Sequence, residues 1–264
     1  MKVAHAKGNQ YEGFFAEFYD ILHAGLKDTD AWIEFGRCFG PDILELGIGT
    51  GRIAIPLALA GFNVTGLDLS DDMIKRCQIK LSYEEECTRE RVSIVKADMS
   101  SFDLKKKFDL ITAPCNVINH LWEPGELLQT LSCVRNHLKD SGTFILDNSI
   151  PDIAYMVSVN DTVQAFEFEH PLTGNKIVDR IKSVYDFVNQ LEYDRIELEE
   201  YDDAGELLRY VLCEDTLTYF FPRELRFILE ASGFVILEQR GSLLEGSPIG
   251  PQSTEMVFVC KKAV

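Results

Sequence analysis

The stretch Asp42–Asp68 constrains the fold of this chain more than any other. It opens with an apolar run, Ile43–Leu46, which is typical of a strand. Glycine occupies every second position of Gly47–Gly51, where a strand must turn into a helix, because glycine permits a left-handed turn and a close ligand. A helical stripe follows, Gly61 ends it, and a second strand runs to Asp68. This order predicts a nucleotide-type cofactor site in which Asp68 can bind ribose hydroxyl groups.

Arg52 narrows the choice of cofactor. The dinucleotide fingerprint G-x-G-x-x-G requires glycine at this position, so NAD and FAD are disfavoured. A G-x-x-x-x-G-K-[ST] loop is also absent from the sequence, which disfavours ATP held in a phosphate cradle.

The composition restricts the classes of partner that this chain is expected to bind. The 264 residues are 46% hydrophobic, which suits one α/β domain with an insertion. The net charge is −17, so nucleic acid and anionic membranes would be repelled. The one basic run, Lys105–Lys107, is expected to be a solvated turn. The predicted partner is therefore a small molecule.

The cysteines and histidines carry no metal or disulfide signature. The seven cysteines form no C-x-x-C pair, and the five histidines are widely separated, so we expect no metal. The first ten residues lack the apolar core of a secretory signal, and no apolar run approaches the roughly 18 residues that a membrane span needs. These features predict a cytoplasmic protein.

The remaining pattern predicts a doubly wound α/β sheet with an antiparallel insertion. Residues 1–40 read as a helical leader broken near Gly25. Further strands are expected at 92–95, 108–113, 143–147, 234–238 and 255–260. Within 160–220 the period changes to two, which predicts three or four antiparallel strands.

The phrases E-L-G-I-G-T-G and L-D-L-S-D-D-M resemble those of class I S-adenosylmethionine (SAM) methyltransferases. The leader phrase Phe18-Tyr19-Asp20 and the phrase Asn119-His120-Leu121 resemble the small-molecule N-methyltransferases, such as glycine N-methyltransferase and the amino-sugar enzymes. The resemblance spans nearly the whole chain and is weakest in the insertion. It implies a seven-stranded, mostly parallel sheet in one domain over residues 1–264, with the strand at 255–260 antiparallel beside that at 143–147. It also implies SAM as donor and S-adenosylhomocysteine as product.

The resemblance also implies the site residues. Tyr19 and Trp32 would close over the cofactor, Leu69 and Met73 would flank adenine, and Asp98-Met99 would bind its edge. The full cofactor-binding set is Tyr19, Trp32, Glu45, Gly47, Ile48, Gly49, Gly51, Asp68, Leu69, Met73, Asp98, Met99 and Cys115. His120 and Tyr19 are the catalytic candidates at the boundary with a small-molecule acceptor, for which an amine is favoured over a hydroxyl or carboxylate. The 160–220 insertion would cover the substrate side or form a homodimer.

Each candidate residue also has a structural interpretation. Tyr19, Trp32 and Met73 could be core residues of their helices, Asp98 could cap the turn at Ser100-Ser101, and His120 could be structural. The acidic stretch Glu192–Glu200 could be a solvated sheet face.

Two rival functions remain open on the sequence. Pro114-Cys115 resembles the nucleophile of cytosine methyltransferases, although the acidic composition and the lack of other motifs argue against that class. A SAM-binding protein without turnover is the second rival.

Overall fold

The structure is a computed structural model that describes residue 11, residues 13–23 and residues 25–263. The side chains of Phe14 and Phe15 lie outside the described set, as does the N-terminal segment for which a secretory signal was considered. The chain forms two compact units. One comprises Leu26–Pro151 and the residues from Phe220 onwards, and the other comprises the described residues up to Gly25 with Asp152–Tyr219.

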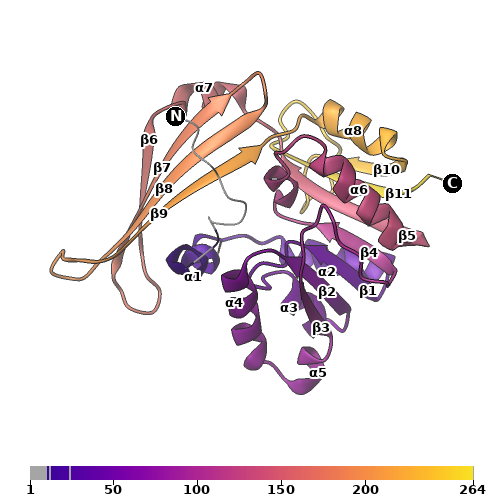
Figure 1. Cartoon of the computed structure of the whole chain (residues 1–264), viewed down its shortest axis with the longest axis horizontal. Coiled ribbons are helices and arrows are strands. Elements are labelled where there is room, and N and C mark those ends of the chain that lie inside the picture. Colours follow the sequence, from indigo (N-terminus) through magenta and orange to yellow (C-terminus); the bar gives the residue numbers. More distant parts are fainter. Residues whose placement is uncertain (1–10, 12, 24, 264) are drawn as a thin grey trace. The chain divides into compact units, whose positions relative to one another are not determined.

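The larger unit is a seven-stranded sheet (Figure 1). Its strands, in spatial order, are β10 (Phe234–Arg240), β11 (Glu255–Lys262), β5 (Leu138–Ser149), β4 (Phe108–Ala113), β1 (Asp42–Leu46), β2 (Asn63–Asp68) and β3 (Val92–Lys96). All neighbours pair in parallel except at β11, which is antiparallel to both β5 and β10. The predicted doubly wound sheet with an antiparallel final strand is confirmed.

Helices cover both faces of this sheet. They are α2 (Thr29–Phe39), α3 (Ala54–Leu59), α4 (Asp71–Ser82), α5 (Glu86–Arg89), α6 (Glu126–His137), α8 (Pro222–Ala231) and the short 3-10 helix η2 (Val117–His120). Because successive strand residues point to opposite faces, Ile43 packs with α2 and α3 whereas Leu44 packs with α6 and α8. The near-continuous apolar strands reflect this burial on both sides.

The smaller unit contains the insertion. Its elements are α1 (Gly13–Leu22), α7 (Ile153–Val159), β6 (Val163–Glu169), β7 (Lys176–Asp186), β8 (Leu191–Tyr201) and β9 (Leu207–Thr218). The four strands form an antiparallel sheet in sequence order, as predicted. Phe18 of α1 packs against Ile177 and Leu198 of this sheet. The leader of residues 1–40 is therefore divided, with α1 in the smaller unit and α2 in the larger.

Some boundaries differ from the expectations. The strand predicted at 143–147 is longer in the structure: β5 begins at Leu138, which already pairs with Phe108, and ends at Ser149. Helices α5, α7 and η2 were not predicted. Among the described residues, no helix is both long and apolar enough to cross a membrane.

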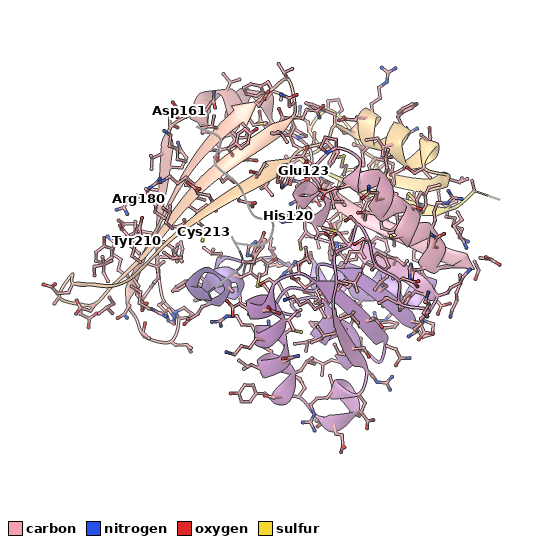
Figure 2. All side chains as sticks on the ribbon, viewed as in Figure 1. His120, Glu123, Asp161, Arg180, Tyr210 and Cys213 are labelled. Carbon is pink, nitrogen blue, oxygen red and sulfur yellow. The ribbon has the colours of Figure 1, made fainter. Side chains whose placement is uncertain are left out.

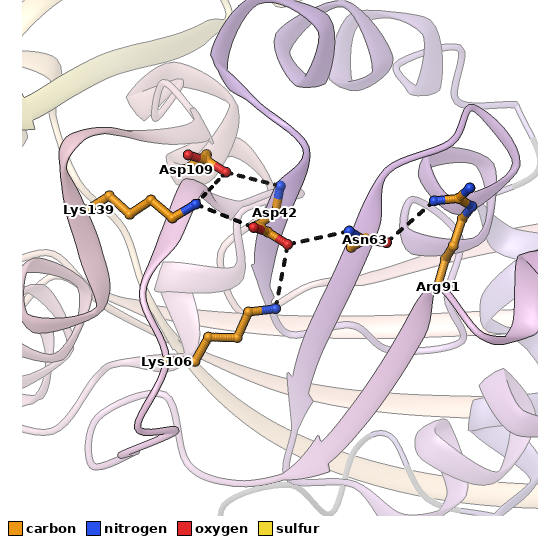
Figure 3. A network of polar contacts seen from close by, with 6 residues as sticks. All are labelled: Asp42, Asn63, Arg91, Lys106, Asp109 and Lys139. Atoms are coloured by element: carbon orange, nitrogen blue, oxygen red, sulfur yellow. Dashed lines mark hydrogen bonds and ion pairs between the residues drawn. The ribbon is translucent and has the colours of Figure 1, made fainter.

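Ion pairs connect β1, β4 and β5 where these strands begin, and Asn63 of β2 donates a hydrogen bond to Asp42 at 3.4 Å (Figure 3). Lys139 Nζ bonds Asp109 at 2.8 Å and Asp42 at 3.3 Å, and Lys106 Nζ lies 3.7 Å from Asp42. Partial burial alone would raise the pKa of Asp42, but the hydrogen bond from Lys139 and the charge of Lys106 outweigh it and lower the pKa. This network ties the sheet together at the edge where its parallel strands start.

Replacing Lys139 by methionine should lower the melting temperature at pH 7 by about 1–3 °C, because exposed ion pairs contribute little individually. Since the pKa of Asp42 is lowered, the stabilisation is complete above the ordinary aspartate pKa of about 4 and disappears as the pH falls through the lowered value. Thermal unfolding at pH 7 and in acid measures both effects. Lys75→Met, at an exposed lysine on α4, is the control. An equal loss at both pH values would contradict the role of the ion pairs.

Candidate functional site

The glycine loop joins β1 to α3 at the carboxyl end of the strands. Gly47, Gly49 and Gly51 have φ angles of 70°, 54° and 79°, in the left-handed region that favours glycine. A Cβ atom on Gly47 would lie 2.4 Å from Val117, and one on Gly51 would lie 2.6 Å from Cys77. A Cβ on Gly49 would meet nothing within 4 Å. Gly47 and Gly51 are thus needed for packing, whereas Gly49 faces open space that a ligand could use.

Ile48 anchors the loop to β2. Its N–H donates to the carbonyl of Leu67 at 2.7 Å, and its buried side chain packs over the space left by Gly66, where a Cβ would lie 2.2 Å away. These two contacts hold the loop against β2.

Asp68, the last residue of β2, fastens the same loop with its side chain. Its carboxylate accepts the N–H of Gly49 at 2.7 Å and the N–H of Ser70 at 2.9 Å. Burial raises the pKa of Asp68, and these hydrogen bonds oppose the rise. A carboxylate has about four lone-pair sites, so two bonds leave capacity for further donors. The structure thus assigns Asp68 a role in the loop beside its predicted role on ribose.

Glu45 is a buried acid of β1 beneath the loop. Its side chain is 1% exposed, and its Oε2 has no hydrogen-bond partner among the described residues. Burial raises the pKa of Glu45 to about 8; Arg52 opposes this, while Asp68 and Asp28 add to it. A buried acid of this kind is stabilised as a carboxylate when a cationic group comes close.

Arg52 is a site residue whose contacts the sequence did not reveal. Its guanidinium forms a two-point ion pair with Asp28, at 2.5 Å to Oδ1 and 2.8 Å to Oδ2, and also contacts the Cys115 thiol. Cys115 Sγ in turn lies 3.6 Å from Asp28 Oδ2. The only available sequence signal was the replacement of a fingerprint glycine by arginine. Arg52 connects the glycine loop, the start of α2 and the segment after β4.

The segment after β4 adopts an unusual backbone. Cys115 and Asn116 both have φ of 58°, which costs energy for residues with a side chain. Two hydrogen bonds hold it: the Cys115 N–H donates to Asp147 at 2.8 Å, and the Ser149 N–H donates to Asn116 at 2.5 Å. Burial, the main cause, raises the pKa of Asp147 to about 7. Asp147 and Asn116, from β5 and this segment, were not among the predicted site residues.

His120 ends the 3-10 helix that follows this segment and is half-buried (Figure 2). Asn116 is the N-cap of this helix, so η2 connects His120 directly to the strained backbone at Cys115-Asn116. The other catalytic candidate, Tyr19, belongs to the smaller unit. Its ring stacks on His23 with centroids 4.1 Å apart and meets the Tyr11 ring edge-on at 5.8 Å.

The residues expected around adenine and over the cofactor differ in accessibility. Leu69 is 41% exposed, whereas Met73 is 3% and Trp32 1% exposed. Met73 therefore has little free surface for a ligand, and Trp32 packs edge-on against Phe35 in the core. Their contacts with a cofactor stay a prediction.

Asp98 forms the turn that the structural interpretation described. Its Oδ1 accepts both the N–H and the hydroxyl of Ser100 at 2.7 Å. Met99 is partly buried against the core beside β3. In the part of the chain that the structure describes, no group of three or more His, Cys, Asp or Glu side chains is arranged to hold a metal ion.

Comparisons with known proteins agree with this arrangement. A family model described as a methyltransferase domain matches residues 43–142. A protein from Geobacillus sp. (strain WCH70), whose name assigns it only to the methyltransferases, is 28% identical over 96% of this chain and 99% of its own length.

Two solved structures have a similar fold. The CcbJ methyltransferase of Streptomyces caelestis is 24% identical with a TM-score of 0.81 and covers 98% of both chains. SAM-bound CalS10, an amino pentose methyltransferase of Micromonospora echinaspora, is 20% identical with a TM-score of 0.69, covering 96% of this chain and 98% of its own.

The environment of Cys115 predicts a slow thiol. Burial, followed by the charge of Asp147, raises its pKa well above the ordinary range, so the thiolate is scarce at neutral pH. In the native protein at pH 8, iodoacetamide should therefore modify the exposed Cys38 and Cys87 at least about tenfold faster than Cys115. Peptide mass spectrometry over time measures the three rates. Preferential labelling of Cys115 would contradict this and would favour a nucleophilic cysteine.

Proposed function

Since the chain belongs to the class I SAM-dependent methyltransferases, we propose that it transfers a methyl group from SAM to a small-molecule acceptor, with an amine favoured over a hydroxyl or carboxylate. The observation that carries the proposal is the arrangement at the carboxyl edge of the sheet. There the open side of Gly49, the carboxylate of Asp68 and the unpartnered oxygen of Glu45 belong to one loop and its two flanking strands.

These residues fit the donor chemically. The backbone at Gly49 would admit the ligand closely, Asp68 would accept ribose hydroxyl groups, and Glu45 would stabilise a cationic group. Leu69, Asp98 and Met99 follow at the ends of β2 and β3, where a base would lie next to the ribose. The bound donor supplies an activated methyl group on a sulfonium, so the protein mainly has to bind, orient and exclude water.

The acceptor preference rests on charge and on His120. A net charge of −17 attracts cationic molecules over long range. An amine must lose a proton to become nucleophilic, and the half-buried His120 at the end of η2 would take it. The amino pentose in the name of CalS10 supports the same acceptor class.

The raised pKa of Cys115 weighs against the cytosine-type alternative, which needs a thiolate.

A panel of amines, phenols and carboxylic acids incubated with methyl-labelled SAM tests the proposal directly. Label on an amine would support it, label on oxygen acceptors alone would correct the acceptor class, and no transfer would favour the non-catalytic alternative.

Substitution of Gly49, with Gly61 as the matched control, tests where the donor binds. Both have positive φ, 54° and 100°, and a Cβ on either would meet nothing within 4 Å in the protein. Alanine at either position should cost about 1–2 kcal/mol of stability through backbone strain. Only Gly49→Ala should also weaken S-adenosylhomocysteine binding, by tenfold or more, because its methyl group enters the ligand's space. Calorimetry with both variants measures this, and equal affinities would refute the placement of the ligand at Gly49.

Replacing His120 by alanine should lower kcat for an amine acceptor by about 10²-fold or more, the range for general acid–base catalysis. The affinity for S-adenosylhomocysteine should stay within about twofold, since His120 follows the cofactor loop and is not part of it. Cys115→Ser, only five positions away, should retain most activity and serves as the control. Full activity of His120→Ala with an amine would remove His120 from the proton transfer.

A further inference from the structure

Asp147 lies near the carboxyl end of β5, in the larger unit. Two residues before it, Ile145 pairs with Thr112 of β4, which pairs with Glu45 of β1. Since alternate residues of a strand share a face, Asp147 and Glu45 project from the same face of the sheet. With β4 between their strands, standard strand geometry places their Cα atoms about 12 Å apart. The two acids therefore belong to different parts of the site.

One hydrogen bond orients the Asp147 carboxylate. Its Oδ1 accepts the Cys115 N–H at 2.8 Å, and no other described residue donates a hydrogen bond to this side chain. Asp147 is only partly buried, so its Oδ2 is available to a ligand. A carboxylate fixed through one oxygen, with the second oxygen uncommitted, is a pre-organised acceptor for an N–H group.

The charged groups around Asp147 do not neutralise it. They are Asp28 before α2, Arg52 before α3 and Glu255 of β11, and Arg52 already forms a two-point ion pair with Asp28. Burial, the largest cause, raises the pKa of Asp147 to about 7; the charges of Asp28 and Glu255 add to the rise, whereas the Cys115 N–H and Arg52 oppose it. A cation bound beside Asp147 would stabilise its ionised form.

The order of the strands places Asp147 beyond the proposed donor site. Along the carboxyl edge the strands follow the order β3, β2, β1, β4 and β5 (Figure 1). The proposed donor site begins with Asp98 and Asp68, at the ends of β3 and β2, and continues over the glycine loop after β1. Its other end therefore points towards β4 and β5. Asp147 lies about 14 Å across the sheet from Asp68, on the side where an acceptor would approach.

We propose that Asp147 selects the acceptor: its Oδ2 accepts an N–H of the acceptor's amine group and balances the positive charge of that amine. Hydrogen bonds between charged partners are roughly twice as strong as neutral ones, so an amine is favoured over a hydroxyl. A carboxylate acceptor would be repelled. The inference deepens the proposed function and rests on it for the identity of the ligand. The proton that the amine loses goes to His120, as proposed above.

The hydrogen bond to the backbone does not by itself require a charge at Asp147. An asparagine oxygen also accepts the Cys115 N–H, and burying a neutral amide costs less than burying a carboxylate. Asp147→Asn therefore keeps this bond and removes the charge. Its melting temperature at pH 8 should not fall by more than about 2 °C. A larger decrease would mean that the charge serves the fold and would overturn the assignment to binding.

The binding test titrates n-butylammonium chloride and the uncharged n-butanol into the full chain saturated with S-adenosylhomocysteine, followed by NMR. Butylammonium should shift the amide resonances of Cys115 and Asn116, and butanol should not. Asp147→Asn should weaken butylammonium binding at least tenfold and leave S-adenosylhomocysteine affinity within about twofold.

Glu255→Gln is the matched control for the loss of one negative charge. Glu255 lies two residues before Val257, which pairs with Asp147, so it projects from the same face one strand away. Its substitution should change butylammonium affinity by less than about threefold. No butylammonium binding by the parent chain, or equal weakening in both variants, would overturn the proposal.

The pH dependence identifies the group that binds the probe. An alkylammonium ion has a pKa near that of lysine, about 10.4, so butylammonium stays charged between about pH 5.5 and 8.5. Because the pKa of Asp147 is raised to about 7, its carboxylate ionises within this range. Butylammonium affinity should therefore rise about fivefold or more from the lower to the higher pH in the parent chain, and stay flat in Asp147→Asn. An equal rise in the variant would assign the titration to another group and overturn the role of Asp147.

Kinetics separate this proposal from the proposed function. With an amine acceptor found by screening, Asp147→Asn should raise the acceptor KM at least tenfold and keep kcat within about threefold. If the parent chain binds butylammonium through Asp147 but transfers no methyl group to any amine, the proposed function fails and the cation site stands. If it methylates amines with a KM that Asp147→Asn does not change, the function stands and the role of Asp147 fails.

Discussion

The hydrogen bond from the Gly49 N–H to the Asp68 carboxylate is the interaction on which the site depends. It joins the end of β2 to the centre of the glycine loop, and the Ile48–Leu67 backbone bond runs beside it. The loop can then adopt three left-handed glycines in a fixed shape with the open side at Gly49. A carboxylate that is already oriented by backbone donors loses little freedom when a ligand binds, so the fold pre-organises the surface that we assign to ribose.

Most of the charged side chains that we describe around this loop are acidic. Asp28 and Arg52 pair, and Asp147 accepts a hydrogen bond from the backbone N–H of Cys115. Glu45 keeps one oxygen that no described residue bonds. The net charge of −17 has the same sign as this group of acids. The donor that we propose to bind here carries a positively charged sulfonium, which is the opposite sign.

The sequence predicted the fold well because its signals were local. The alternating pattern in 160–220 predicted the antiparallel sheet, and the glycine spacing in Gly47–Gly51 predicted the turn between β1 and α3. The sequence did not reveal contacts between segments that are far apart in the chain. No local pattern indicates that Arg52 meets Asp28 or that Asp147 holds the Cys115 backbone, because each contact depends on segments brought together by the fold. For Trp32 and Met73, the sequence and the structure indicate different roles. Their motifs favour contact with a ligand, whereas their burial favours a role in the core.

The central claim is that the carboxyl edge around Gly49 and Asp68 is the donor site, and a crystal structure with S-adenosylhomocysteine tests it most directly. The account predicts ribose hydroxyl groups within about 2.5–3.0 Å of the Asp68 carboxylate and ligand atoms in van der Waals contact with Gly49 Cα. The Gly49–Asp68 hydrogen bond should remain in the complex. A ligand bound elsewhere on the chain, or a ribose that leaves Asp68 without a new partner, would contradict the account.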